Sequence, residues 1–216
     1  MKAYRSKELP YYIVGNVVIL LVLLNPSRSK DYIKEIGIAV ALSATLYVYT
    51  FILDALLSKQ VKIVLTYGSE YRLPGYKVFD DILKNRDIRY DAAIAEAQYA
   101  NVYEVMDALT GKERGKYENT RWYTIYKKLS GDEAVAATQS DYLLCRDLNI
   151  CTLSICVIYL LVVVLFWLVM GVILFNAWFL LILGIEWIVT NIAMRNKAIR
   201  FVHTVIAKDL EGGEKK

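Results

Sequence analysis

The fold is decided by residues 151–194, which read CTLSICVIYLLVVVLFWLVMGVILFNAWFLLILGIEWIVTNIAM. Two apolar segments of about 20 residues, the length that crosses a bilayer, lie here on either side of a short turn. No Lys or Arg occurs between Arg146 and Arg195, and the charged residue within the run is Glu186. A soluble core does not use so long an uninterrupted apolar run. The stretch therefore predicts a transmembrane hairpin with helices at residues 151–170 and 177–194.

Two further apolar segments lie upstream, at residues 9–24 and 36–57. The first is short for a span and follows Lys2, Arg5 and Lys7, so a signal peptide is the competing interpretation. No small-residue cleavage site follows it, which favours a retained helix. The second segment is long enough to span a bilayer with some tilt.

The expected fold is an all-α membrane protein with four transmembrane helices. Its parts are a first helix pair in residues 1–57, a cytoplasmic helical domain in residues 58–150 between spans two and three, the hairpin in residues 151–194 and a cytoplasmic tail in residues 195–216. Lys and Arg flank both ends of the hairpin, and its turn carries no charge. The positive-inside rule therefore predicts a multi-pass protein of the bacterial inner membrane with both termini in the cytoplasm.

Composition argues against direct nucleic-acid binding and against enzyme chemistry. The net charge is only +4, and residues 58–149 hold 14 Lys and Arg against 14 Asp and Glu. His203 is the only histidine and is expected at a surface. The sequence therefore shows no evident histidine-based triad and no HExxH zinc site. Cys145, Cys151 and Cys156 lack C-x-x-C spacing. The sequence predicts no enzyme, no metal site and no cofactor.

The middle region reads as mostly helical. Asp91 can cap a helix that ends before Gly111, and a second helix is expected over residues 117–129. Ser130 and Glu133 have the spacing of a capping box. No helix breaker separates them from the third span, which predicts one continuous helix running from the cytoplasm into the membrane.

Four polar residues are candidates for an intramembrane or pore-lining role: Glu186, Asn191, Asp54 and Asn16. A charge in hydrocarbon must face other helices, face a water-filled cavity or be protonated. In a symmetric oligomer Glu186 would form an acidic ring of the kind that selects cations. The alternative, of equal weight, is a buried carboxyl that hydrogen-bonds Asn16 or a serine on a neighbouring helix.

Five residues are candidates for binding a ligand or partner: Lys112, Arg114, Lys116, Arg121 and Trp122. Guanidinium groups beside aromatic rings can hold a nucleotide or phosphorylated ligand by ion pairing and stacking. The glycine spacing around this stretch does not fit a phosphate-binding P-loop. The alternative is a solvated loop beside core aromatic residues.

Several short motifs are scattered over most of the chain. They are YYIVG at residues 11–15, Leu73-Pro74, Asp87-Ile88, Trp122-Tyr123 and Tyr142 followed by Arg146-Asp147. With the four-span pattern, they resemble small four-span bacterial membrane proteins of anti-phage defence systems, of the Kiwa type or controlled by cyclic nucleotides. In such systems these proteins act as membrane effectors or infection sensors. The motifs form no signature, and no residue role is carried over.

The expected function is that of a homo-oligomeric inner-membrane effector or sensor in anti-phage defence, a tetramer being one possible assembly. Its cytoplasmic domain would respond to a soluble partner protein or a nucleotide signal and alter membrane integrity or ion permeability. The expected partners are therefore the lipid bilayer, other copies of the same chain, and the soluble protein or nucleotide that acts as the signal. The alternative is a non-conducting membrane scaffold that anchors a soluble enzyme or a nucleic-acid-binding protein.

Overall fold

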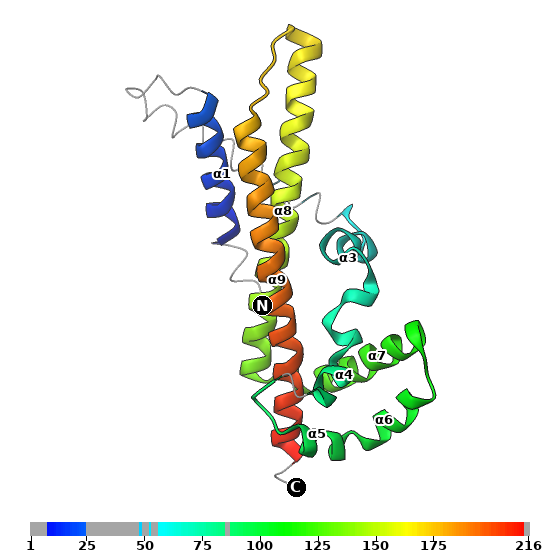
Figure 1. The fold of residues 1–216 in the computed structure, drawn as a ribbon. Helices are drawn as coiled ribbons and strands as arrows, with labels where there is room; N and C mark the ends of the chain where they lie inside the picture. Colours follow the sequence, from blue (N-terminus) through cyan, green and yellow to red (C-terminus); the bar gives the residue numbers. More distant parts are fainter. Residues whose placement is uncertain (1–7, 25–47, 49–51, 53–55, 85–86, 214–216) are drawn as a thin grey trace. The chain divides into compact units, whose positions relative to one another are not determined.

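The computed structural model of the protein describes residues 8–24, 48, 52, 56–84 and 87–213. Within these ranges the chain forms eight α-helices and two short 3-10 helices, with no β-strand (Figure 1). The helices are α1 (Glu8–Leu24), α3 (Lys59–Tyr67), η2 (Glu70–Arg72), η3 (Pro74–Tyr76), α4 (Val78–Leu83), α5 (Ala92–Gln98), α6 (Ala100–Asp107), α7 (Gly111–Leu129), α8 (Glu133–Met170) and α9 (Ala177–Gly213).

The prediction of four transmembrane helices is wrong. Among the described residues, only α8 and α9 are long and apolar enough to cross a membrane. Helix α1 is apolar but has 17 residues, which at about 1.5 Å per residue is shorter than the roughly 30 Å of a hydrocarbon core. The expected second span, residues 36–57, lies almost wholly outside the described residues.

The helices belong to two compact units, and α8 and α9 each supply residues to both. The first, here called the apolar unit, comprises residues 1–62 and 144–193. The second, the globular unit, comprises residues 63–143 and 194–216. The segment 195–216 was expected to form a separate tail. Its described part, residues 195–213, instead continues α9 and belongs to the globular unit.

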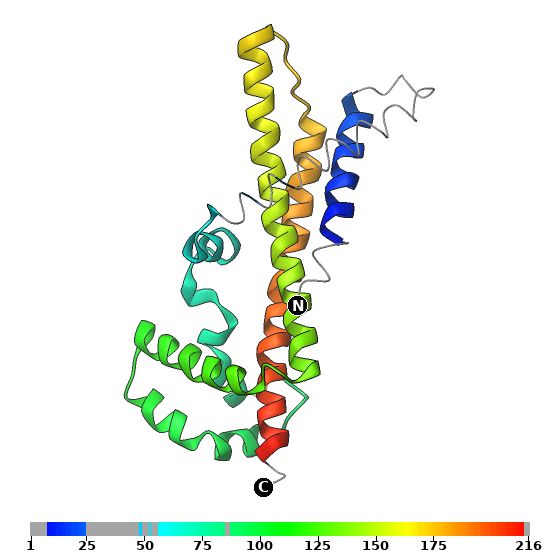
Figure 2. The same ribbon diagram turned by 180° about the vertical axis from the view of Figure 1, so that it is seen from behind.

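The core of the apolar unit lies where α1, α8 and α9 meet. Ile13 of α1, Ile155 of α8 and the α9 residues Phe179 and Leu183 are buried in one cluster. Figures 1 and 2 both show α8 and α9 side by side over this stretch. The ring of Tyr159 packs edge-on against Phe179, with centroids 5.0 Å apart.

Asn176 holds the turn between α8 and α9. Its Oδ1 accepts a hydrogen bond of 3.2 Å from Phe179 N and so caps the start of α9. Its side-chain amide donates to the Leu23 carbonyl at the end of α1, and its backbone N–H donates to the Tyr159 hydroxyl. One residue therefore satisfies the polar groups of the turn and ties α1 to it.

Aromatic residues dominate the core of the globular unit. Phe79 of α4 is fully buried and meets Tyr99 and Tyr103 edge-on, at centroid distances of 5.3 and 6.2 Å. Trp122 of α7 stacks on Tyr126 and lies edge-on to Phe201 of α9. Figure 2 shows α6 and α7 as neighbouring rods in this unit. The remaining buried core residues are Val78, Ile82, Ala95, Val102, Met106, Ile125, Val135, Val202, Val205, Ile206 and Leu210.

The middle region is helical, as predicted, but its helices begin and end at other residues than expected. Asp91 is confirmed as a cap, because its carboxylate accepts a hydrogen bond of 2.7 Å from Ala93 N. The helix is interrupted at Tyr99, which divides it into α5 and α6. Gly111 does not stop a helix; it begins α7 in a left-handed conformation with φ of 54°.

The prediction of one continuous helix is confirmed by α8, which runs from Glu133 to Met170. Its cap, however, is Asp132, whose carboxylate accepts a hydrogen bond of 3.0 Å from Val135 N. Ser130 instead ends α7 and donates to the Lys127 carbonyl. The capping box predicted at Ser130 is therefore wrong by two positions.

Replacing Phe79 by Ala tests the aromatic core. The substitution removes a fully buried ring between two tyrosines and is expected to lower the free energy of unfolding of the globular unit by about 3–5 kcal/mol. Urea unfolding in a non-ionic detergent, followed by near-ultraviolet circular dichroism, measures it. The control is Tyr123→Ala, whose side chain is 47% exposed and whose loss should change stability by less than about 1 kcal/mol. Equal effects would contradict the assignment of this core.

Candidate functional site

A polar cluster around Glu186 lies inside the apolar unit. The Tyr12 hydroxyl of α1 donates a hydrogen bond of 2.7 Å to Glu186 Oε2 on α9, and it lies 2.8 Å from Thr152 Oγ1 on α8. A single tyrosine therefore connects the three helices. The Glu186 carboxyl has a partner within its own chain, and that partner is Tyr12 instead of the expected Asn16 or serine.

The other intramembrane candidates do not gather around Glu186. Asn16 is buried and donates its side-chain amide to the Tyr12 carbonyl one turn earlier in α1. Asn191 is half-buried on α9 and takes no part in the bonds between Tyr12 and Glu186. Asp54 lies outside the described residues. The structure thus brings together one predicted polar residue and two that the sequence did not single out.

A second polar contact in the apolar unit was missed from the sequence. Asn149 of α8 is fully buried, and its amide donates to the Trp187 carbonyl and to Thr190 Oγ1 on α9, each at 3.0 Å. The Thr190 hydroxyl also lies 2.8 Å from the Glu186 carbonyl. Polar side chains therefore connect α8 and α9 within two turns of Glu186.

A cavity of about 390 Å³ lies in the globular unit beside the first turns of α7. We call it the basic cavity, because three of its lining residues are basic and two are acidic. The lining residues are Lys77, Lys112, Arg114, Asp80, Glu118, Tyr71, Tyr76, Gly111 and Gly115.

Two glycines allow η3 to approach α7 closely at the edge of the basic cavity. A Cβ atom added at Gly115 would lie 2.9 Å from Tyr76 Cδ1, and one added at Gly75 would collide with the Asn119 side chain. A larger residue at Gly115 would require the Tyr76 ring to shift, and one at Gly75 would require the Asn119 side chain to shift. The position of the Tyr76 ring therefore depends on Gly115.

Aromatic rings and lysines form one wall of the basic cavity. Tyr71 and Tyr76 lie edge to face with centroids 5.9 Å apart. The Lys112 ammonium stands 4.9 Å from the centroid of the Tyr71 ring, within cation–π range. Among the described residues, neither Lys77 nor Lys112 forms a salt bridge. No carboxylate among the described residues therefore neutralises these two cations.

A charge network around the buried Glu118 forms another part of the cavity lining. Glu118 is 1% exposed, and its Oε2 accepts hydrogen bonds from Phe79 N at 3.0 Å and Asp80 N at 3.4 Å, so it caps α4. Arg114 binds Asp80 at 2.6 Å and lies 3.9 Å from the other Glu118 oxygen. Burial, helped by the Asp80 charge, raises the pKa of Glu118 to about 7.

The five predicted ligand-binding residues separate in the structure. Lys112 and Arg114 line the basic cavity. Lys116 is exposed on α7 and Arg121 is half-buried, and neither lines it. Trp122 belongs to the core, where its indole N–H donates a hydrogen bond of 3.2 Å to a backbone carbonyl of α9. For Trp122 the alternative interpretation, a core aromatic residue, is the one observed.

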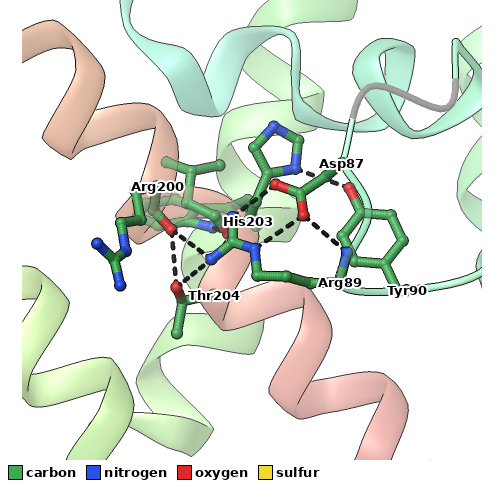
Figure 3. A network of polar contacts seen from close by, with 8 residues as sticks. Asp87, Arg89, Tyr90, Arg200, His203 and Thr204 are labelled. Carbon is green, nitrogen blue, oxygen red and sulfur yellow. Dashed lines mark hydrogen bonds and ion pairs between the residues drawn. The ribbon is translucent and has the colours of Figure 1, made fainter.

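A third polar group joins the segment before α5 to α9 (Figure 3). The Arg89 guanidinium binds both carboxylate oxygens of Asp87, at 2.8 and 2.6 Å. It also donates to Thr204 Oγ1 at 2.6 Å and to the Arg200 carbonyl at 3.2 Å. These bonds hold the pKa of Asp87 below its usual range. They are a structural clamp that needs no ligand.

His203 adjoins this clamp and is not at a surface. It is 4% exposed, its Nδ1 lies 2.7 Å from the Tyr90 hydroxyl, and the two rings stack. Burial lowers the pKa of His203, although the nearby Asp87 charge opposes the shift. The expected surface position is wrong, because α9 continues through this residue and packs into the globular core.

An open groove of about 710 Å³ runs past the clamp, between the start of α8 and α9. It is lined by charges of both signs: Arg89, Arg200 and Lys208 against Asp87 and Glu211. Arg89 and Lys208 are already engaged by Asp87 and Glu211. In the described part of the chain, no three His, Cys, Asp or Glu residues are placed to hold a metal ion.

Substituting Glu118 by Gln tests its raised pKa. The Glu118 carboxyl has a pKa of about 7 in the folded chain, against 4.5 for an unperturbed glutamate. The folded state therefore retains the proton between these values, and stability falls as the pH rises from about 5 to 7. Relative to Glu118→Gln, the wild-type chain should lose up to about 3 kcal/mol across this range.

The measurement is thermal melting of both chains in detergent at pH 5, 6, 7 and 8. His203, whose lowered pKa has the opposite effect on stability, is present in both chains, so it cancels from their difference. A wild-type chain that gained stability over the variant with rising pH would show that Glu118 is ionised and favourably paired.

Comparison of the chain with protein-family models, curated proteins and solved structures finds no match. The function therefore has to be inferred from the residues and geometry of the chain itself.

Proposed function

We propose that the chain is an integral membrane protein that holds its globular unit at the cytoplasmic face and responds there to a ligand or partner. The observation that carries this proposal is the exposure of the apolar stretch of α8. Leu165, Leu168 and Val169 are 57%, 65% and 77% exposed. Soluble monomers do not present a contiguous apolar surface of this extent to water. Lipid is the surrounding that such a helix pair fits.

The charges around the hairpin support a cytoplasmic globular unit. Arg146 precedes the apolar part of α8, and Arg195, Lys197 and Arg200 follow that of α9. The turn at residues 171–176 has no charged side chain. This bias supports placing both ends of the hairpin inside, and with them the residues of the globular unit.

Helix continuity supports a role in sensing. Helices α8 and α9 are each continuous and have residues in both units. Helix α9, for example, supplies Leu183 to the core of the apolar unit and Val205 to the core of the globular unit. A change in the packing of the globular unit would act on helices that also belong to the apolar unit. The resemblance to anti-phage membrane proteins supports the further proposal of an oligomeric effector that alters ion permeability during infection.

A second candidate is a membrane anchor without conductance, and the Glu186 cluster favours it. The Glu186 carboxyl is hydrogen-bonded by Tyr12 within one chain, so no ring of subunits is needed to satisfy it. Such an anchor would carry a soluble enzyme or another partner on its globular unit.

Membrane integration predicts resistance to alkaline carbonate extraction. The wild-type chain should stay in the pellet. Replacing Leu161 and Leu165 by Lys places two charges on an exposed face of α8, each costing about 3 kcal/mol in a bilayer, and should move most of the chain to the supernatant or abolish its insertion. Tyr123→Lys, in the globular unit, is the control and should change nothing. Extraction of the wild-type chain would refute the membrane proposal.

Membrane potential distinguishes the effector from the anchor. In bacteria expressing the chain with a voltage-sensitive dye, an effector should cause depolarisation that Glu186→Leu abolishes. The control Val189→Leu changes an exposed apolar residue nearby and should leave depolarisation intact. Absence of depolarisation in all three, with insertion verified by carbonate extraction, would favour the anchor.

A further inference from the structure

We infer that the basic cavity binds a small molecule in which a phosphate group lies close to an aromatic ring system, as in a mononucleotide. The inference deepens the proposed function, because it names the chemical class of the signal that the globular unit would detect. It depends on the side chains that surround the cavity and on their charges.

The charge balance of the basic cavity favours an anion. Its lining contains three basic residues, Lys77, Lys112 and Arg114, and the two acidic residues Asp80 and Glu118. Arg114 is engaged by Asp80 at 2.6 Å, which leaves the two lysines as cations without a carboxylate among the described residues. An ammonium group is a regular phosphate ligand in proteins. The cavity can therefore accept a phosphate without breaking an existing salt bridge.

The aromatic wall favours a ligand that also carries a ring. Tyr71 and Tyr76 border the cavity, and the described residues provide no hydrogen-bond partner for either hydroxyl. Stacking of a nucleobase on an aromatic side chain is worth about 1–3 kcal/mol and depends little on which base is present. The Lys112 ammonium lies beside the Tyr71 ring. One ligand could therefore bind the ammonium through its phosphate and stack its ring on the tyrosine.

The volume of the basic cavity sets the size of the ligand. About 390 Å³ lies at the lower end of the range of roughly 300–1,000 Å³ in which small-molecule sites fall. A mononucleotide fits this range, whereas a folded nucleic acid does not. Gly115 leaves room for the Tyr76 ring, which lines the cavity.

The test is calorimetric titration of the full chain in a non-ionic detergent at low salt, with AMP and inorganic pyrophosphate as separate probes. Lys112→Gln should weaken AMP binding by about tenfold, the loss of one charged contact. Lys116→Gln is the matched control, because Lys116 is an exposed lysine one turn along α7 that does not line the cavity. It should bind AMP like the wild-type chain.

A second variant tests the ring contact. Tyr71→Leu should weaken AMP binding several-fold and leave pyrophosphate binding within about twofold, since pyrophosphate has no ring to stack. Pyrophosphate binding as tight as AMP binding, with neither probe affected by Tyr71→Leu, would overturn the aromatic part of the inference.

Two results would overturn the site as a whole: no heat with either probe at millimolar concentration, or equal losses from Lys112→Gln and Lys116→Gln. Both substitutions change exposed side chains, so melting temperatures equal to wild type show that folding is intact. If binding fails while the chain still resists carbonate extraction, the inference falls and the membrane proposal stands. If AMP binds as expected but carbonate extraction releases the chain, the ligand site stands and the membrane proposal falls.

Discussion

Hydrocarbon offers no hydrogen-bond partners, and this constraint governs the apolar unit in its proposed surroundings. Its polar side chains therefore bond to one another across helices. Tyr12 reaches Glu186 and Thr152, and Asn176 ties the turn to α1. Apolar packing alone is not directional, so it would fix the register of the three helices against one another less strictly. The polar contacts fix the register of α1 against the hairpin, because Tyr12 and Leu23 of α1 each bond to a particular partner on the hairpin.

The same constraint explains why one carboxyl can be read as a pore residue or as a structural one. A carboxyl in an apolar setting is retained only where something satisfies it, either water in a channel or a neighbouring side chain. In one chain Tyr12 already fills that role for Glu186. In a conducting state, an ion bound at the Glu186 carboxylate would compete with the Tyr12 hydroxyl for the same oxygen.

The features that could be predicted from the sequence are those set by residues close together in the chain. Asp91 caps its helix through a bond to a residue two positions away, and α8 is continuous because no breaker interrupts it. Contacts between distant segments were not predictable. Tyr71 and Lys77 join the basic cavity only because η3 packs on α7, and His203 is buried only because the end of α9 enters the globular core. The prediction that Gly111 follows the end of a helix was wrong, because glycine also occurs at the start of helices, where Gly111 lies. The first of the four expected spans failed on length, since α1 has 17 residues.

The interleaving of the two units has a consequence for how the protein is made. The core of the globular unit combines residues 78–135 with Phe201, Val205 and Leu210, and the hairpin lies between them in the chain. At a synthesis rate of about 5–20 residues per second, the ribosome adds the last core helix seconds after the first part has emerged. Until then Trp122 lacks its contacts with Phe201 and with the Val202 carbonyl of α9. The globular unit therefore completes its fold only after the hairpin has been translated. In the proposed membrane setting, an error in inserting the hairpin would also disturb the folding of the globular unit.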